Sequence, residues 1–114
     1  MPSDAPLILL KDSVAGESGA PAVVLLHGFL GTRKDWRPVV DELTPDYRCI
    51  SVDLPGHGGS FVKDPARGFT FEAFCDVLNE RLDLLKADRI ALVGYSMGGR
   101  MALYYALRHP GRVR

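Results

Sequence analysis

The residues best suited to chemistry are Gly94, Ser96 and Gly98, which form a Gly-x-Ser-x-Gly pattern directly after the apolar run 90–93. This pattern is typical of a nucleophile elbow, a sharp strand-to-helix turn that exposes a serine hydroxyl at the end of a sheet. Glycine on both flanks lets the backbone turn without a clash of Cβ atoms. The alternative is a glycine-rich helix start with an incidental serine, which the preceding strand and the following helix disfavour. The spacing therefore predicts that Ser96 is a catalytic serine.

A second motif, His27-Gly28-Phe29, follows another apolar run at 22–26. In an α/β sheet the loop after such a strand supplies one backbone N–H group to an oxyanion hole, and the residue after the serine supplies the other. The predicted donors are the amides of Phe29 and Met97. His27 is also a candidate base, but its place at a strand end before a turn glycine favours a role in orienting the loop.

Three further residues are of types that could serve as an acid or a base. His57 lies in the glycine-rich segment 53–60 and is interpreted as a structural loop histidine. His109 ends a predicted helix, where a positive ring suits the helix dipole. Asp53 ends a strand and could be a triad acid, although no histidine is evidently aimed at it. The sequence thus predicts a nucleophile and an oxyanion hole without a base.

The strands that must position these groups are predicted from continuous apolar runs. Segments 22–26, 47–53 and 88–93 read as parallel strands that are covered on both faces. Segment 7–10 is expected to form an edge strand, and segment 11–21 a polar loop. Residues 112–114 resemble the first residues of a further strand.

The helices alternate with these strands. Asp35 is predicted to cap a helix that runs to about Leu43, and Thr70 a longer one with an apolar stripe at three- and four-residue steps. The third helix is expected at 97–108. Alternating strands and helices predict an α/β fold with a mainly parallel sheet flanked by helices.

Composition narrows the function classes. The 114 residues carry 14 basic and 14 acidic side chains, a formal net charge of zero, which favours neither nucleic acid nor an anionic membrane as partner. The apolar runs are strand-sized, and the N-terminus lacks the pattern of a secretory signal. Cys49 and Cys75 lack metal or redox spacing and are expected to be buried reduced thiols. We expect a cytoplasmic protein without a metal.

Taken together, segments 25–29, 53–60 and 94–99 resemble the α/β-hydrolase superfamily. The resemblance extends over residues 1–114 and implies the N-terminal half of an α/β-hydrolase fold, a partial domain. In that superfamily the triad acid and histidine, the lid and the C-terminal strands come later in the chain than Arg114. The resemblance therefore implies a truncated, inactive fragment with an exposed sheet edge that favours self-association.

A narrower resemblance rests on Gly-Phe-Leu-Gly at 28–31, on Asp35-Trp36, on the doubled glycine within 57–60 and on Arg100 after the elbow. These segments are similar to the 2-succinyl-6-hydroxy-2,4-cyclohexadiene-1-carboxylate synthases of menaquinone biosynthesis. That family consists of cofactor-free lyases, which eliminate pyruvate from an enolpyruvyl cyclohexene carboxylate.

The same resemblance implies roles for individual residues. Ser96 would abstract a proton as the triad serine, with Phe29 and Met97 as oxyanion donors. Arg100 and Tyr95 would hold a small-molecule carboxylate substrate, which suits the forked geometry of a guanidinium. Arg100 as a plain helix-surface residue and Tyr95 as a packing residue remain alternatives. Trp36 is predicted either to line the mouth of the pocket or to pack at a helix start.

Two other functions stay open at this stage. One is a serine hydrolase of the same fold, an esterase or a C–C bond hydrolase, which differs from the lyase in its substrate and in the use of Arg100. The other is a non-catalytic truncated fragment.

Overall fold

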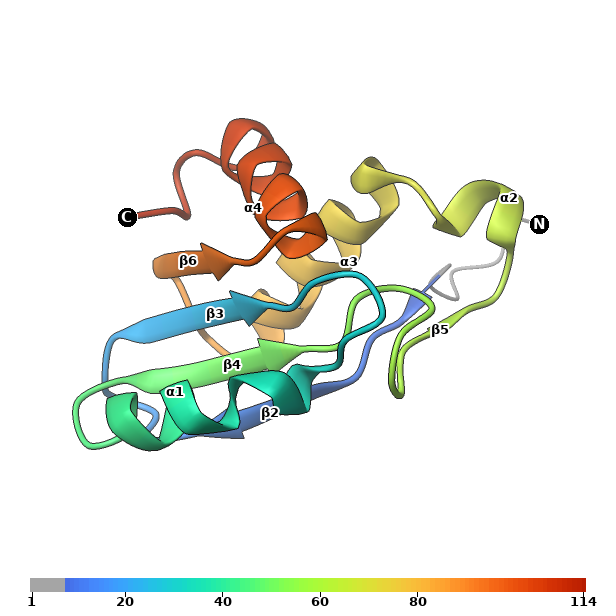
Figure 1. The fold of residues 1–114 in the computed structure, drawn as a ribbon. Coiled ribbons are helices and arrows are strands. Elements are labelled where there is room, and N and C mark those ends of the chain that lie inside the picture. Colours follow the sequence, from blue (N-terminus) through green and yellow to red (C-terminus); the bar gives the residue numbers. More distant parts are fainter. Residues whose placement is uncertain (1–7) are drawn as a thin grey trace.

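The computed structural model describes residues 8–114, which form a sheet covered by helices on both faces (Figure 1). The strands are β1 (Ile8–Leu9), β2 (Asp12–Ala15), β3 (Ala22–Leu26), β4 (Arg48–Val52), β5 (Phe61–Val62) and β6 (Ile90–Gly94). The helices are the 3₁₀ turn η1 (Arg33–Trp36), α1 (Arg37–Leu43), α2 (Pro65–Gly68), α3 (Phe71–Leu84) and α4 (Met97–Arg108). This alternation confirms the predicted α/β fold.

The main sheet has the strand order β2-β4-β3-β6, in which β4, β3 and β6 are parallel and β2 is antiparallel to β4. Every residue of β3 and β4 is buried, as expected for parallel strands with both faces covered. The three strands predicted at 22–26, 47–53 and 88–93 are confirmed to within two residues at each end.

Alternate side chains of the strands point into two separate apolar clusters. The larger cluster joins Val24, Leu26 and Ile50 to the buried stripe of α3 and to α4. The smaller cluster joins Val23 and Leu25 to residues of η1 and α1. In Figure 1, α1 accordingly lies in front of the sheet and α3 behind it. Both cysteines are buried and free, as predicted, and burial raises the pKa of Cys75 to about 11.

Two predictions in the first third of the chain are wrong. The expected loop 11–21 contains strand β2, which pairs antiparallel with β4. A half-exposed edge strand needs only one partner, so the polar composition of this segment does not prevent pairing. Asp35 is not a helix cap: Thr32 caps η1, and the Asp35 carboxylate accepts a hydrogen bond from the Thr32 N–H in a capping box.

The edge strand predicted at 7–10 is partly confirmed. Leu7 lies outside the described residues, and Ile8–Leu9 pair with β5 in a separate two-stranded sheet. The predictions for the later helices are confirmed, because Thr70 accepts a hydrogen bond from the Ala73 N–H at 3.0 Å and α4 spans 97–108.

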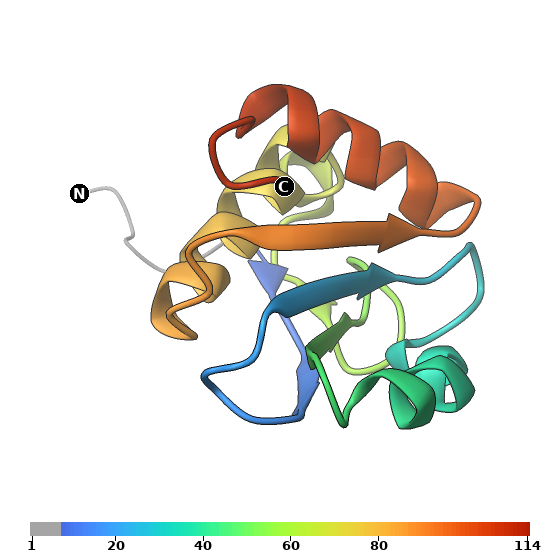
Figure 2. The same cartoon turned by 90° about the vertical axis from the view of Figure 1, so that its left-hand side faces the viewer.

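Strand β6 forms one edge of the main sheet, opposite the edge formed by β2. Among the described residues its outer edge carries a single parallel bridge, between Ile90 and Val113. The Ile90 N–H donates to the Arg112 carbonyl and the Arg114 N–H to the Ile90 carbonyl, each at 2.8 Å. The C-terminal residues thus lie alongside β6 (Figure 2), in line with the prediction that residues 112–114 resemble the start of a further strand. No helix within residues 8–114 is long and apolar enough to cross a membrane.

Candidate active site

Ser96 occupies the turn between β6 and α4 in a backbone conformation that few residues adopt. Its φ of 55° and ψ of −113° lie outside the ordinary regions and cost on the order of 1–3 kcal/mol. A Cβ atom on Gly94 would lie 2.4 Å from the Gly98 carbonyl oxygen, and one on Gly98 would lie 2.1 Å from the Leu26 carbonyl oxygen. Both glycines are therefore required for the turn, and Ser96 stands exposed at the carboxyl end of β6.

The loop after β3 touches this turn directly. The Tyr95 N–H donates to the Leu26 carbonyl at 3.0 Å, and a Cβ atom on Gly28 would meet the Tyr95 ring at 2.9 Å. Among the described residues the amides of Phe29 and Met97 donate no hydrogen bond. Met97 is also the first residue of α4, where the helix dipole favours negative charge. Two unused donors thus lie on the segments that flank Ser96, as an oxyanion hole requires.

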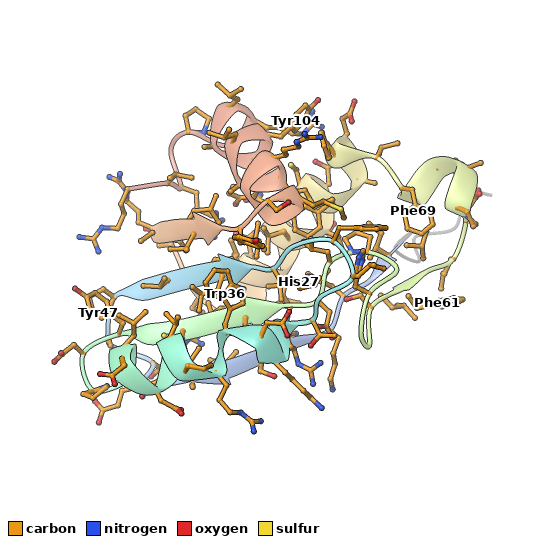
Figure 3. The ribbon with its side chains drawn as sticks, in the orientation of Figure 1. His27, Trp36, Tyr47, Phe61, Phe69 and Tyr104 are labelled. Carbon is orange, nitrogen blue, oxygen red and sulfur yellow. The ribbon has the colours of Figure 1, made fainter. Side chains whose placement is uncertain are left out.

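His27 has both ring nitrogens engaged. Its Nδ1–H donates to the Gly28 carbonyl at 2.7 Å and its Nε2 accepts from the Leu54 N–H at 2.9 Å, a pattern that assigns the neutral Nδ1–H tautomer. Burial lowers the pKa of His27, and this effect exceeds the opposing effect of the Gly28 hydrogen bond. His27 lies where β3 and β4 end (Figure 3) and orients the loop, as predicted, rather than acting as a base for Ser96.

Asp53 is fully buried and its carboxylate is also engaged. It accepts hydrogen bonds from the Arg33 N–H and guanidinium, both at 2.6 Å, and from the Gly59 N–H at 2.8 Å. Burial acts to raise the pKa of Asp53, but these hydrogen bonds and the Arg33 charge outweigh it and hold the pKa below its ordinary value. Asp53 is therefore an ionised structural group, in line with the prediction that it is not the triad acid.

The other two histidines, His57 and His109, pack against different aromatic side chains. The His57 ring lies 5.2 Å from the His27 ring and 5.8 Å from the Phe29 ring, in an edge-on contact with Phe29. His109 ends α4 and packs against Tyr105 with ring centroids 4.9 Å apart. Within residues 8–114, neither ring hydrogen-bonds Ser96.

The two predicted substrate-binding side chains border different hollows. Arg100 and Ser96 share a hollow of about 530 Å³ between β6 and α4, lined mainly by apolar residues. Tyr95 is 69% exposed and borders a second hollow of about 320 Å³, together with His27, Gly28, Asp35 and Trp36. Trp36 packs in the smaller apolar cluster, with its Nε1 buried and unpartnered among the described residues. Ser96 and Arg100 border the same hollow, whereas Tyr95 borders another.

One group that the sequence analysis overlooked is Arg33. Its backbone and guanidinium reach Asp53, and its Nε donates to the Ser13 hydroxyl at 2.7 Å. In the sequence, the only sign of this role of Arg33 is its position just after the predicted oxyanion loop.

Within residues 8–114, no cluster of three or more His, Cys, Asp or Glu side chains could hold a metal ion. The described site thus offers an exposed serine and two free amides.

Comparison with known proteins identifies the fold family. Residues 21–114 match the family described as the alpha/beta hydrolase fold. Among curated proteins, the putative 2-succinyl-6-hydroxy-2,4-cyclohexadiene-1-carboxylate synthase of Bacillus subtilis is 39% identical over 98 residues, which cover 86% of this chain and 35% of the relative. The synthase of Enterobacter sp. is 39% identical over 104 residues, 91% of this chain and 39% of the relative. The chloroplastic protein PHYLLO of Arabidopsis thaliana is 40% identical over 105 residues, which cover 86% of this chain but only 6% of PHYLLO.

Solved structures give the same fold. An epoxide hydrolase mutant of Vigna radiata superposes with a TM-score of 0.86 at 30% identity, over 93% of this chain and 33% of that one. A marine microorganism esterase superposes with a TM-score of 0.82 at 25% identity, over 92% of this chain and 39% of that one. The chain thus spans less than two fifths of the length of each of these proteins.

Proposed function

The chain belongs to the α/β-hydrolase fold family, and from this premise we propose that it carries the nucleophile and oxyanion-hole part of a lyase that eliminates pyruvate from an enolpyruvyl cyclohexene carboxylate. The observation that carries the proposal is the exposed Ser96 in its strained turn, flanked by the unused amides of Phe29 and Met97. Arg100 lies one helical turn after Ser96, and its guanidinium suits a substrate with several carboxylates. The names of the relatives from Bacillus subtilis and Enterobacter support the same reaction.

The proposed reaction breaks a C–H bond and a C–O bond of the substrate. Ser96 accepts the ring proton beside the succinyl carbonyl, and the charge that develops on that carbonyl oxygen is stabilised by the Phe29 and Met97 amides. The electron pair then forms a ring C=C bond and expels enolpyruvate, which takes up a proton to become pyruvate. Arg100 holds a carboxylate of the substrate during these steps.

Ser96 cannot accept a proton until its own hydroxyl proton has been removed. A serine without an adjacent base keeps an ordinary, weakly nucleophilic hydroxyl. Both nitrogens of His27 are occupied, and no described histidine hydrogen-bonds Ser96. We therefore expect that a base outside residues 8–114 completes the site, and that the 114-residue chain alone shows no measurable turnover.

The proposal is tested by pyruvate release from the enolpyruvyl cyclohexene carboxylate. The assay uses the natural polypeptide that carries these residues and compares the unmodified protein with Ser96→Ala and Arg100→Met. Ser96→Ala should abolish release, and Arg100→Met should raise KM at least about tenfold because a charge-assisted pair is lost. Ser18→Ala, in the exposed turn between β2 and β3, is the matched control. Absence of pyruvate release by the unmodified protein would refute the lyase.

A serine hydrolase is the second candidate, favoured by the likeness to the solved esterase and by the separate hollow of Tyr95. The same protein and the same Ser96→Ala variant are assayed with a small p-nitrophenyl ester. Ester hydrolysis that depends on Ser96, without pyruvate release, would select this candidate. Inactivity in both assays would select the third alternative, a non-catalytic fragment.

A further inference from the structure

We propose that Asp53 is a positioning residue for the oxyanion hole, because its buried carboxylate fastens the loop that carries the Phe29 amide to the loop that follows β4. This inference rests on the proposed function, since it assigns a task to the Phe29 amide. The two loops, residues 27–33 and 53–60, are called the loop junction below.

The carboxylate of Asp53 is shared between the two loops. One oxygen accepts from the Arg33 N–H at 2.6 Å, and the other accepts from the Arg33 guanidinium at 2.6 Å and from the Gly59 N–H at 2.8 Å. The side chain of Asp53 has no exposed surface. A buried carboxylate costs several kcal/mol to desolvate, so it persists only where charge and hydrogen bonds offset that cost.

The loop after β4 is wrapped closely around this carboxylate. Gly58 has a φ of +52°, and a Cβ atom there would lie 2.4 Å from the Asp53 carboxylate. The Ser60 hydroxyl donates to the Asp53 carbonyl at 2.7 Å, and the Lys11 N–H donates to the Ser60 hydroxyl at 2.8 Å. The backbone of this loop is therefore a rigid support for the neighbouring loop.

The predicted oxyanion donor lies between the two fastening points. On one side of Phe29, His27 links the Gly28 carbonyl to the Leu54 N–H. On the other side, Arg33 is held by Asp53. Between them Leu30 has a φ of 66° and the Gly31 N–H donates to the Gly28 carbonyl at 3.0 Å, which forms a tight turn. Loss of either fastening point should let the Phe29 amide move, and displacement by about 1 Å is enough to reduce catalysis strongly.

The first experiment measures the loop without any assay of activity. Asp53→Asn is compared with the unmodified protein by amide NMR in the natural polypeptide that carries these residues. We expect a shifted Phe29 amide resonance and hydrogen exchange at Gly31 that is about tenfold faster. Asp12→Asn is the matched control, because Asp12 is also buried, at 6% exposure, and is paired at 2.5 Å with Arg81 of α3. Unchanged Phe29 and Gly31 signals in Asp53→Asn, or equal changes in Asp12→Asn, would overturn the proposal.

The second experiment separates positioning from general stability. If pyruvate release is observed, Asp53→Asn should lower kcat about tenfold or more with KM within about threefold, because an oxyanion donor acts on the transition state. Asp12→Asn should leave both constants within about twofold. A normal kcat in Asp53→Asn, despite a displaced Phe29 resonance, would overturn the proposal. If the unmodified protein releases no pyruvate, the proposed function fails while the NMR comparison still decides on Asp53.

A milder variant, Arg33→Lys, tests the proposal even if Asp53→Asn does not fold. Arg33→Lys keeps the positive charge and the backbone N–H but removes the forked guanidinium, and the Arg33 side chain is 16% exposed. It should produce smaller changes of the same kind at Phe29 and Gly31. Absence of any change in this folded variant would count against the proposal.

Discussion

The loop junction and the side of the molecule formed by β6 and α4 both flank Ser96, but they are built in opposite ways. The loop junction buries a histidine and an aspartate and satisfies each with hydrogen bonds across two loops. The β6–α4 side exposes Val93, Leu103 and Leu107, and β6 carries one bridge on its outer edge among the described residues. The loop junction is thus fixed by buried hydrogen bonds, whereas the β6–α4 side is open.

This contrast explains which functions each region can serve. A preorganised oxyanion hole must hold its donors before the reaction begins, so rigidity is needed there. A surface with exposed apolar side chains is suited to being covered by further polypeptide. Substitutions in one region are expected to weaken it while leaving the other intact.

The largest effect is expected from Gly98→Ala. The new Cβ atom would lie 2.1 Å from the Leu26 carbonyl and 2.4 Å from the His27 carbonyl, and neither backbone can yield. We expect the free energy of unfolding to fall by about 3 kcal/mol or more, measured by urea denaturation. Gly99→Ala is the control, because its nearest contact would be 3.4 Å, and it should be neutral or slightly stabilising in a helix. Equal stability of the two variants would contradict a tight elbow.

Asp53→Asn should have the next largest effect on stability, about 3 kcal/mol near neutral pH, because it removes one partner of a buried ion pair. The pKa of Asp53 is lowered in the folded protein, so its contribution is present above the ordinary value of 3.8 and is lost as pH falls through the lower folded-state pKa. The difference between the two proteins should therefore shrink as pH falls below about 4 in urea denaturation. A difference that is independent of pH would show that charge is not involved.

His27→Gln should have a moderate effect, about 1–2 kcal/mol at pH 7.5, because one of two buried hydrogen bonds is retained. The lowered pKa of His27 means that the unfolded chain binds a proton more readily, so the stability of the unmodified protein should fall as pH drops below the ordinary value of 6.5. When the pH is lowered from 7.5 to 5.5, Tm measured by thermal unfolding should decrease less in His27→Gln than in the unmodified protein. His109→Gln, at the end of α4, should keep the full decrease.

The smallest change in stability, under about 0.5 kcal/mol, is expected from the double variant Leu103→Lys and Leu107→Lys, since these side chains are 70% and 82% exposed. The expected self-association through the open side should nevertheless weaken, because charge opposes apolar contact. Sedimentation velocity over a range of concentrations measures this effect. Leu84→Lys, at 75% exposure on α3, is the control and should not change association.

The sequence predicted the elements whose signal is local. The runs of β3, β4 and β6 are continuous and apolar, Thr70 and the stripe of α3 follow helical spacing, and the elbow lies between a strand and a helix. Strand β2 was missed because its short polar sequence has no apolar run that would indicate a strand. Its strand conformation depends on pairing with β4, which lies far away in the chain.

The candidate site divides in the same way. Ser96 and its flanking glycines are recognisable from spacing alone, since the tight turn requires residues without a Cβ atom. The link from Arg33 to Asp53 was not predicted, because a buried ion pair between two loops leaves no periodic pattern in the sequence. The separation of Tyr95 and Arg100 into two hollows likewise depends on tertiary packing.

The hydrogen bond from the Tyr95 N–H to the Leu26 carbonyl has a consequence for the order of folding. It joins the ends of β3 and β6, which are distant in the chain, so the entropy of closing a long loop must be overcome before it forms. The conformation of Ser96 can therefore arise only after the central strands have paired. The turn at Ser96 is thus expected to be among the last features acquired during folding.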